Sequence, residues 1–116
     1  MEILRLDAAS AEPIGQRPYE VKHVASIELA QGEGEVHAYT LYFEAGGEIA
    51  PHEAGFGQIL FAVAGDGWVS GDDGERIPLA QGEAAIIRRG EIHSRRSETG
   101  RTAFMVQVHD LTPLRR

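Results

Sequence analysis

The feature that most constrains the fold of this chain is a series of short apolar runs separated by turns rich in glycine and aspartate. No stretch keeps a helical apolar period with capping residues over three turns, so long helices are not expected. The runs alternate apolar and polar residues or carry β-branched side chains, which is typical of strands. They cover residues 19–29, 35–44, 58–64, 68–70, 76–79, 84–88 and 102–109. Short strands at this spacing predict an all-β sandwich or barrel.

Two glycine-framed segments carry the residues that are most informative about function. The first runs from Gly47 to Gln58 and contains His52, and the second runs from Gly82 to His93. These segments resemble the two motifs of the cupin family. The first family motif places His-x-His and then Glu before a glycine, and the second places Gly, Pro, Gly and His. His52 and His93 stand where the first and the last of these histidines belong.

The resemblance covers about residues 41–108 and includes one copy of each motif. It implies a single-domain double-stranded β-helix, the barrel that is also called the cupin or jelly-roll fold. We therefore expect residues 19–110 to form a cupin β-barrel. Residues 1–18 are expected to form an N-terminal arm or edge segment, and residues 111–116 a C-terminal tail.

The family's usual metal site, which uses three histidines and a glutamate, is only half present. Ala54 stands at the middle histidine and Gln58 at the glutamate. The resemblance implies a divalent transition metal (Fe, Ni, Zn, Mn or Cu) held by His52, Gln58, His93 and waters. His37 or His109 are weaker candidates for a further ligand. Against this, an amide oxygen is uncharged, so Gln58 would not offset the charge of a divalent cation.

A metal-free pocket is the alternative reading of the same residues. His52 and His93 would then form hydrogen bonds to Gln58, whose amide both donates and accepts. Strand alternation puts Arg95 on the same face as His93, where a guanidinium can pair with carboxylate or phosphate oxygens. Burial of Arg95 without an acidic partner would favour such a ligand over a surface salt bridge.

Three further residues are candidates for the lining of the pocket. Arg88 stands at the proline of the second cupin motif, near the expected rim of the barrel. Phe56 lies in the turn Gly55-Phe56-Gly57, and Tyr39 lies in the run 35–44. Core or surface packing is the more frequent role of such aromatic side chains.

Three classes of function remain open. The first is a metal-dependent enzyme of the dioxygenase, isomerase or lyase type that acts on a small molecule in the barrel lumen. The second is a metal-free protein that binds or senses a small, anionic ligand. The third is metal-free acid–base catalysis by His52 or His93. The fold alone does not decide among them, because one fold hosts many activities.

Charge and composition limit the partners. The formal net charge of −7 argues against a nucleic-acid surface, which needs clustered positive charge. No apolar run approaches the length of a membrane helix, and residues 1–15 are too polar for a signal peptide, so a cytoplasmic protein is expected. Because the run 58–63 is apolar on the face opposite Gln58, it needs a cover. The N-terminal segment, a second sheet or another subunit could supply it, and we expect a homodimer.

Overall fold

The computed structural model of the protein describes residues 1–114. Within this range the chain forms eleven strands and one short 3-10 helix, η1 (Ala8–Ser10). No helix in this part of the chain is long and apolar enough to cross a bilayer. The strands are β1 (Glu2–Arg5), β2 (Glu12–Pro13), β3 (Ala25–Ser26), β4 (Ala30–Phe43), β5 (Gly47–Glu53), β6 (Gly57–Gly65), β7 (Trp68–Ser70), β8 (Arg76–Pro78), β9 (Glu83–Ile87), β10 (Ile92–Ser97) and β11 (Arg101–Pro113).

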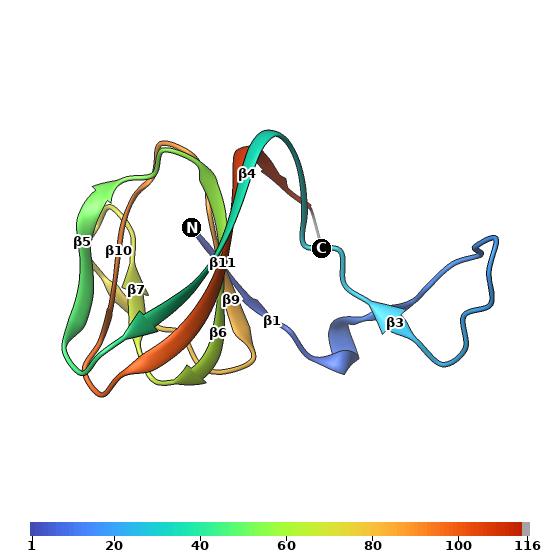
Figure 1. Cartoon of the computed structure of the whole chain (residues 1–116), viewed down its shortest axis with the longest axis horizontal. Helices are drawn as coiled ribbons and strands as arrows, with labels where there is room; N and C mark the ends of the chain where they lie inside the picture. The colour runs from blue at the N-terminus through green and yellow to red at the C-terminus, as the bar shows by residue number, and fades with distance from the viewer. Residues whose placement is uncertain (115–116) are drawn as a thin grey trace.

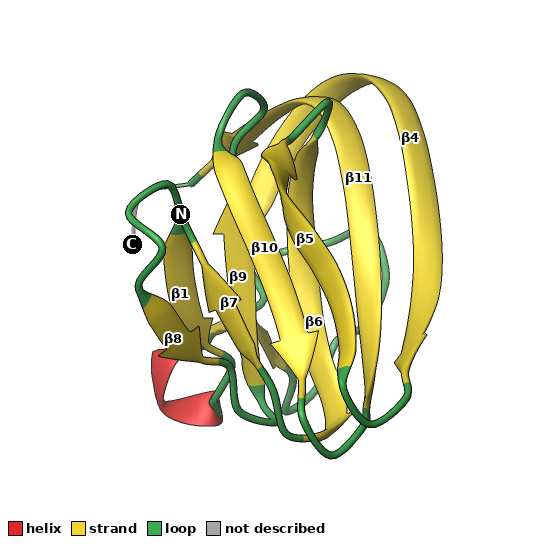
Figure 2. Cartoon of the chain, turned by 90° about the vertical axis from the view of Figure 1, so that its left-hand side faces the viewer, coloured by secondary structure: helices red, strands yellow, loops and turns green. Residues whose placement is uncertain are grey.

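Two antiparallel sheets form the body of the molecule. The larger sheet has the strand order β1-β9-β6-β11-β4, and the smaller has the order β5-β10-β7-β8. Figures 1 and 2 show the two sheets as facing layers, with β5, β10 and β7 on the side opposite β9, β6 and β11. This arrangement confirms the predicted all-β cupin-type barrel. It leaves β4 and β5 as the strands at one open edge of each sheet.

The main core lies between the two sheets. Leu60 and Ala62 of β6 pack there with Val69, Leu79 and Met105, all of them buried. Ile59 lies on the other face of β6, in a second cluster with Ala84 and Ile86. The alternation predicted for residues 58–63 is therefore the one observed, because successive side chains of a strand point to opposite faces.

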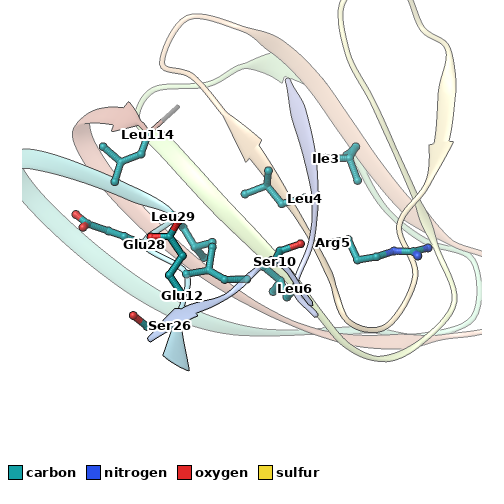
Figure 3. A pocket seen from close by; sticks show the side chains of 11 residues that line it. Ile3, Leu4, Arg5, Leu6, Ser10, Glu12, Ser26, Glu28, Leu29 and Leu114 are labelled. Atoms are coloured by element: carbon teal, nitrogen blue, oxygen red, sulfur yellow. The ribbon is translucent and has the colours of Figure 1, made fainter. Parts of the chain in front are cut away.

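The second cluster is covered by the N-terminal segment of the same chain. Leu4, Leu6 and Leu29 pack against Ile59, Ala84 and Ile86. Figure 3 shows Leu4, Leu6, Leu29 and Leu114 around a hollow of about 480 Å³ that remains beside this contact. Of the three covers considered from the sequence, the N-terminal segment is thus present at one end of the sheet.

The segment 11–28 differs from the expectation. A strand was predicted over residues 19–29, but only Ala25–Ser26 is extended and paired, and its partner is the two-residue strand β2. His23 has a positive φ of 56°, which interrupts an extended strand. Figure 1 shows β3 and the loop beside it projecting away from the barrel.

The boundaries of several other elements also differ from those predicted from the sequence. The polar segments that became β5 and β10 were not among the predicted runs, because they lack an apolar alternation. The tail expected over residues 111–116 begins later, since β11 continues to Pro113, which pairs with Ala30. Within the expected arm of residues 1–18, β1 pairs with β9 at the edge of the larger sheet. Arg115 and Arg116 lie outside the described residues.

Two valines of different burial test this description of the core. Val69 is 1% exposed between the sheets, whereas Val24 is 52% exposed on the projecting segment. We expect Val69→Ala to lower the free energy of unfolding by about 2 kcal/mol, because it leaves a cavity in the core. Val24→Ala should change it by less than about 0.5 kcal/mol. Urea denaturation measures both, and equal effects would contradict the placement of these residues.

Candidate functional site

His52 and His93 face each other on neighbouring strands. They are directly paired in the register of β5 and β10, and their ring centroids are 4.4 Å apart. His93 is 1% exposed, whereas His52 is exposed. The structure therefore brings the two histidines of the motifs together, with His52 on the solvent side of the pair.

Arg95 connects the histidine pair to Gln58. Its Nη2 donates to Oε1 of Gln58 at 2.8 Å and to Nδ1 of His93 at 2.7 Å. Its Nη1 contacts the sulfur of Met105 at 3.4 Å. Arg95 is only 3% exposed, and this burial lowers its pKa to about 10, so the guanidinium stays charged at neutral pH.

No carboxylate compensates this buried charge. None of the ion pairs among residues 1–114 includes Arg95. The Nε of Arg95 is also buried without a hydrogen-bond partner. Neutral acceptors offset only part of the cost of burying a cation, so the site retains excess positive charge and an unused donor.

The hydrogen bonds fix which nitrogen of each histidine carries the proton. Nδ1 of His52 lies 2.8 Å from the carbonyl oxygen of Ala50, which only accepts, so His52 is protonated on Nδ1. The guanidinium of Arg95 only donates, so Nδ1 of His93 accepts and neutral His93 carries its proton on Nε2. His52 thus keeps a free lone pair on Nε2. The Nε2–H of His93 is buried without a partner.

His93 is neutral at physiological pH. Burial lowers its pKa from 6.5 to about 4, because the charged imidazolium is poorly solvated inside the barrel. The charges of Arg95 and His52 contribute to this lowered pKa, and Glu91 acts in the opposite direction. The neutral form is also the one that can accept the hydrogen bond from Arg95.

A group of rings lies on the same face of the larger sheet at its open edge. Gln107 of β11 is opposite both Gln58 of β6 and His37 of β4, so the three side chains share the face toward the lumen. His37 stacks on Tyr39 at 6.1 Å and meets Phe56 at 5.6 Å. Phe56 in turn contacts His109 at 5.2 Å. These rings form one cluster at the open edge of the larger sheet.

Two predicted site residues, Arg88 and His109, do not join the hydrogen-bonded group of Arg95, His93 and Gln58. Arg88 is exposed and lines a separate hollow with Met1 and Glu91. His109 is held by Arg89 and Asp110.

Met105, in contrast, was not predicted as a site residue, although alternation along 102–109 puts it on the face of Gln107. Ser70 and Ser94 were also missed, and they form a buried hydroxyl pair.

The residues present do not fit a divalent metal. Among residues 1–114, no group of three or more His, Cys, Asp or Glu side chains could hold an ion, so His37 and His109 do not complete a site with His52 and His93. His93 uses its lone pair toward Arg95, and Gln58 uses its carbonyl oxygen in the same way. Of the facing pair His52 and His93, only His52 keeps a free imidazole lone pair, on Nε2. The guanidinium beside it would also repel a cation.

Comparisons with known proteins give a family and a fold. The model of the AraC-like ligand-binding domain family matches residues 37–110. No curated protein matches the chain. The matched range contains His37, His52, Gln58, His93 and Arg95.

Solved structures share the fold at low identity. An RmlC-like cupin from Shewanella frigidimarina has 23% identity and a TM-score of 0.59, over 71% of this chain and 69% of that chain. An RmlC-like cupin with a double-stranded β-helix fold from Methanocaldococcus jannaschii has 14% identity and a TM-score of 0.61, over 84% and 94%. A DMSP lyase from Ruegeria pomeroyi has 22% identity and a TM-score of 0.58, over 63% and 38%.

The low pKa of His93 predicts a pH dependence of stability. The unfolded chain takes up a proton near pH 6.5, but folded His93 does so only near pH 4, so protons favour unfolding between these values. The stabilisation is complete above pH 6.5, and about 3 kcal/mol is lost as the pH falls to 4. Urea denaturation across this range measures the loss. The His93→Gln variant should lose less stability than wild type, and equal slopes would contradict the assignment.

Proposed function

Because the chain belongs to the AraC-like ligand-binding domain family, whose fold is of the cupin type, we propose that it binds a small anionic molecule between its sheets without a metal. The observation that carries this proposal is the buried guanidinium of Arg95, which has no acidic partner within the described chain. A ligand carboxylate or phosphate would supply the missing negative charge.

Two unpaired hydrogen-bond donors of the site also favour an anionic ligand. Nε of Arg95 and Nε2–H of His93 are buried and unpaired, and buried N–H groups normally have acceptors. An anionic oxygen would satisfy such donors, whereas a cation would not. Gln58 and Met105 hold the guanidinium in position, because each contacts one of its terminal nitrogens. The exposed ring of His52 and the rings at Phe56 would meet the remainder of the ligand.

Acid–base catalysis is the second candidate, and the two tautomers favour it. His52 offers a lone pair on Nε2, whereas His93 and Arg95 offer N–H groups and positive charge nearby. A base beside donors of this kind can remove a proton from a bound molecule and stabilise the anion that forms. This candidate requires the ligand site proposed above, so it extends that proposal.

The metal-dependent enzyme is the least supported of the three classes. Solved neighbours include a DMSP lyase and a predicted oxalate decarboxylase, but both are under 25% identical to this chain and share only its fold. In addition, the tautomer of His93 and the charge of Arg95 disfavour a divalent ion. A cytoplasmic location and the absence of nucleic-acid partners stay predictions from the sequence.

Titration of small anions tests the proposed function. We expect carboxylates or inorganic phosphate to bind wild-type protein in calorimetry and to raise its melting temperature. Arg95→Met should lose this binding without losing stability, because it removes an unpaired buried charge at similar volume. Arg96→Met is the matched control and should bind normally, since Arg96 is held by Glu98 and Glu48.

The outcomes separate the alternatives. Equal anion affinity of wild type and Arg95→Met would contradict the proposal. Exchange of a C–H of the bound carboxylate for deuterium, lost in His52→Gln, would support acid–base catalysis. Elemental analysis of protein purified without added metal addresses the remaining class. A stoichiometric metal that is lost in His52→Ala would favour the metal-dependent enzyme over the metal-free site.

A further inference from the structure

A further hollow lies at the open edge of the barrel, between β4 and β5. Its volume is about 420 Å³, which is within the range of about 300–1,000 Å³ that is typical of small-molecule pockets. Figure 2 shows β11 and β4 extending past β5, which is the last strand of the smaller sheet on that side. The residues that line the hollow are Leu41, Tyr42, Phe43, Glu44, Gly47, Glu48 and Ile49.

The inner wall of this hollow is apolar and lies next to the buried guanidinium. Leu41 and Phe43 are half-buried and pack against the main core, so they face the lumen. Ile49 is directly opposite Arg95 in the register of β5 and β10. Residues that are opposite each other in a sheet share one face, and Arg95 faces the lumen because it contacts Gln58. Ile49 therefore joins the hollow to the site.

The opening between β4 and β5 has two halves of different chemistry. One half holds His52, whose Nε2 keeps a lone pair, and His37, which contacts Glu35. The other half is the hollow, whose inner wall offers only hydrocarbon. Arg95 borders both halves, because His93 and Arg95 are opposite His52 and Ile49. An anion bound to Arg95 can therefore place an apolar group in the hollow, where that group leaves water.

The rim of the hollow is acidic. Glu44 and Glu48 stand on it, and both are exposed. None of the ion pairs within residues 1–114 includes Glu44. Glu48 lies 3.7 Å from Arg96, but Arg96 is held more closely by Glu98, at 2.6 Å. A second anionic group on the ligand would meet this negative charge, and no basic residue of the described chain lines the hollow to offset it.

We propose that the ligand is a monocarboxylate with an apolar body. Its carboxylate binds Arg95, and its body fills the hollow between Leu41, Phe43 and Ile49. This inference rests on the proposed function, because the carboxylate must bind Arg95, and it adds the chemical class of the ligand. Burial of the body supplies affinity, and the acidic rim discriminates against dicarboxylates.

A series of carboxylates tests the class of ligand. Calorimetry with acetate, butanoate and hexanoate should show an affinity that rises about threefold to fourfold for each added CH₂, because each one is buried in the hollow. Hexanoate should therefore bind about 50-fold or more tightly than acetate. Adipate has the same six-carbon chain with a second carboxylate, and it should bind about 10-fold or more weakly than hexanoate.

Two variants of Ile49 place the apolar body. Ile49→Thr keeps a β-branched side chain on the strand but makes the wall polar, so the ratio of hexanoate to acetate affinity should fall about fivefold. Ile49→Trp should also lower this ratio, because its ring occupies the hollow. Val36→Thr is the matched control. Val36 is 58% exposed on the opposite face of β4, so its substitution should leave the ratio unchanged.

The outcomes separate this inference from the proposed function. If Arg95→Met binds acetate as well as wild type does, both fail. If acetate binding requires Arg95 but hexanoate binds no more tightly than acetate, only the apolar body is wrong. Hexanoate that still binds Arg95→Met, or a ratio that is unchanged in both Ile49 variants, places the body elsewhere and overturns the inference. Adipate that binds as tightly as hexanoate contradicts the choice of a monocarboxylate.

Discussion

The buried guanidinium of Arg95 is the constraint on which the rest of the site depends. It lies between Gln58, His93 and Met105, and no acidic side chain of the described chain offsets its charge. Burial of a charge without an opposite charge is costly, and neutral acceptors recover only part of that cost. An anionic ligand is the interaction that the donors of this site are suited to make.

Arg95 also determines what the two histidines can do. Burial keeps the ring of His93 neutral by lowering its pKa, and the charge of Arg95 acts in the same direction. The hydrogen bond that Arg95 donates to Nδ1 places the proton of His93 on Nε2. The usual metal site of the cupin fold needs lone pairs where this chain presents a donor and a cation. The change of a glutamate to Gln58 fits the same account, since a neutral amide accepts from Arg95 without adding the charge that a metal would require. The same barrel thus supports a site of opposite electrostatic character.

The sequence predicted the fold and several residues of the site, but not the pattern of hydrogen bonds among those residues. Turn spacing predicted an all-β sandwich or barrel, and the resemblance to the cupin motifs selected the barrel. Alternation on residues 58–63 predicted the two faces of its strand, because that pattern is local. The contact between Arg95 and His93 is also local, since the residues are two apart on one strand. The contact of Met105 with Arg95 was not predictable, because it depends on how distant strands align. The tautomer of His93 depends on which ring nitrogen faces Arg95, and strand alternation does not specify that. A strand was predicted over residues 19–29, but only Ala25–Ser26 is extended and paired there, since the positive φ of His23 interrupts an extended strand.

The orientation of the His93 proton tests this account most directly. Nitrogen-15 NMR of the imidazole rings at neutral pH distinguishes the two tautomers, because protonated and unprotonated ring nitrogens have well separated shifts. The account predicts that His93 is neutral with its proton on Nε2, and that Arg95→Met removes this preference. A proton on Nδ1 of His93 in wild-type protein would contradict it, since that ring could neither accept from Arg95 nor donate from Nε2 to an anion.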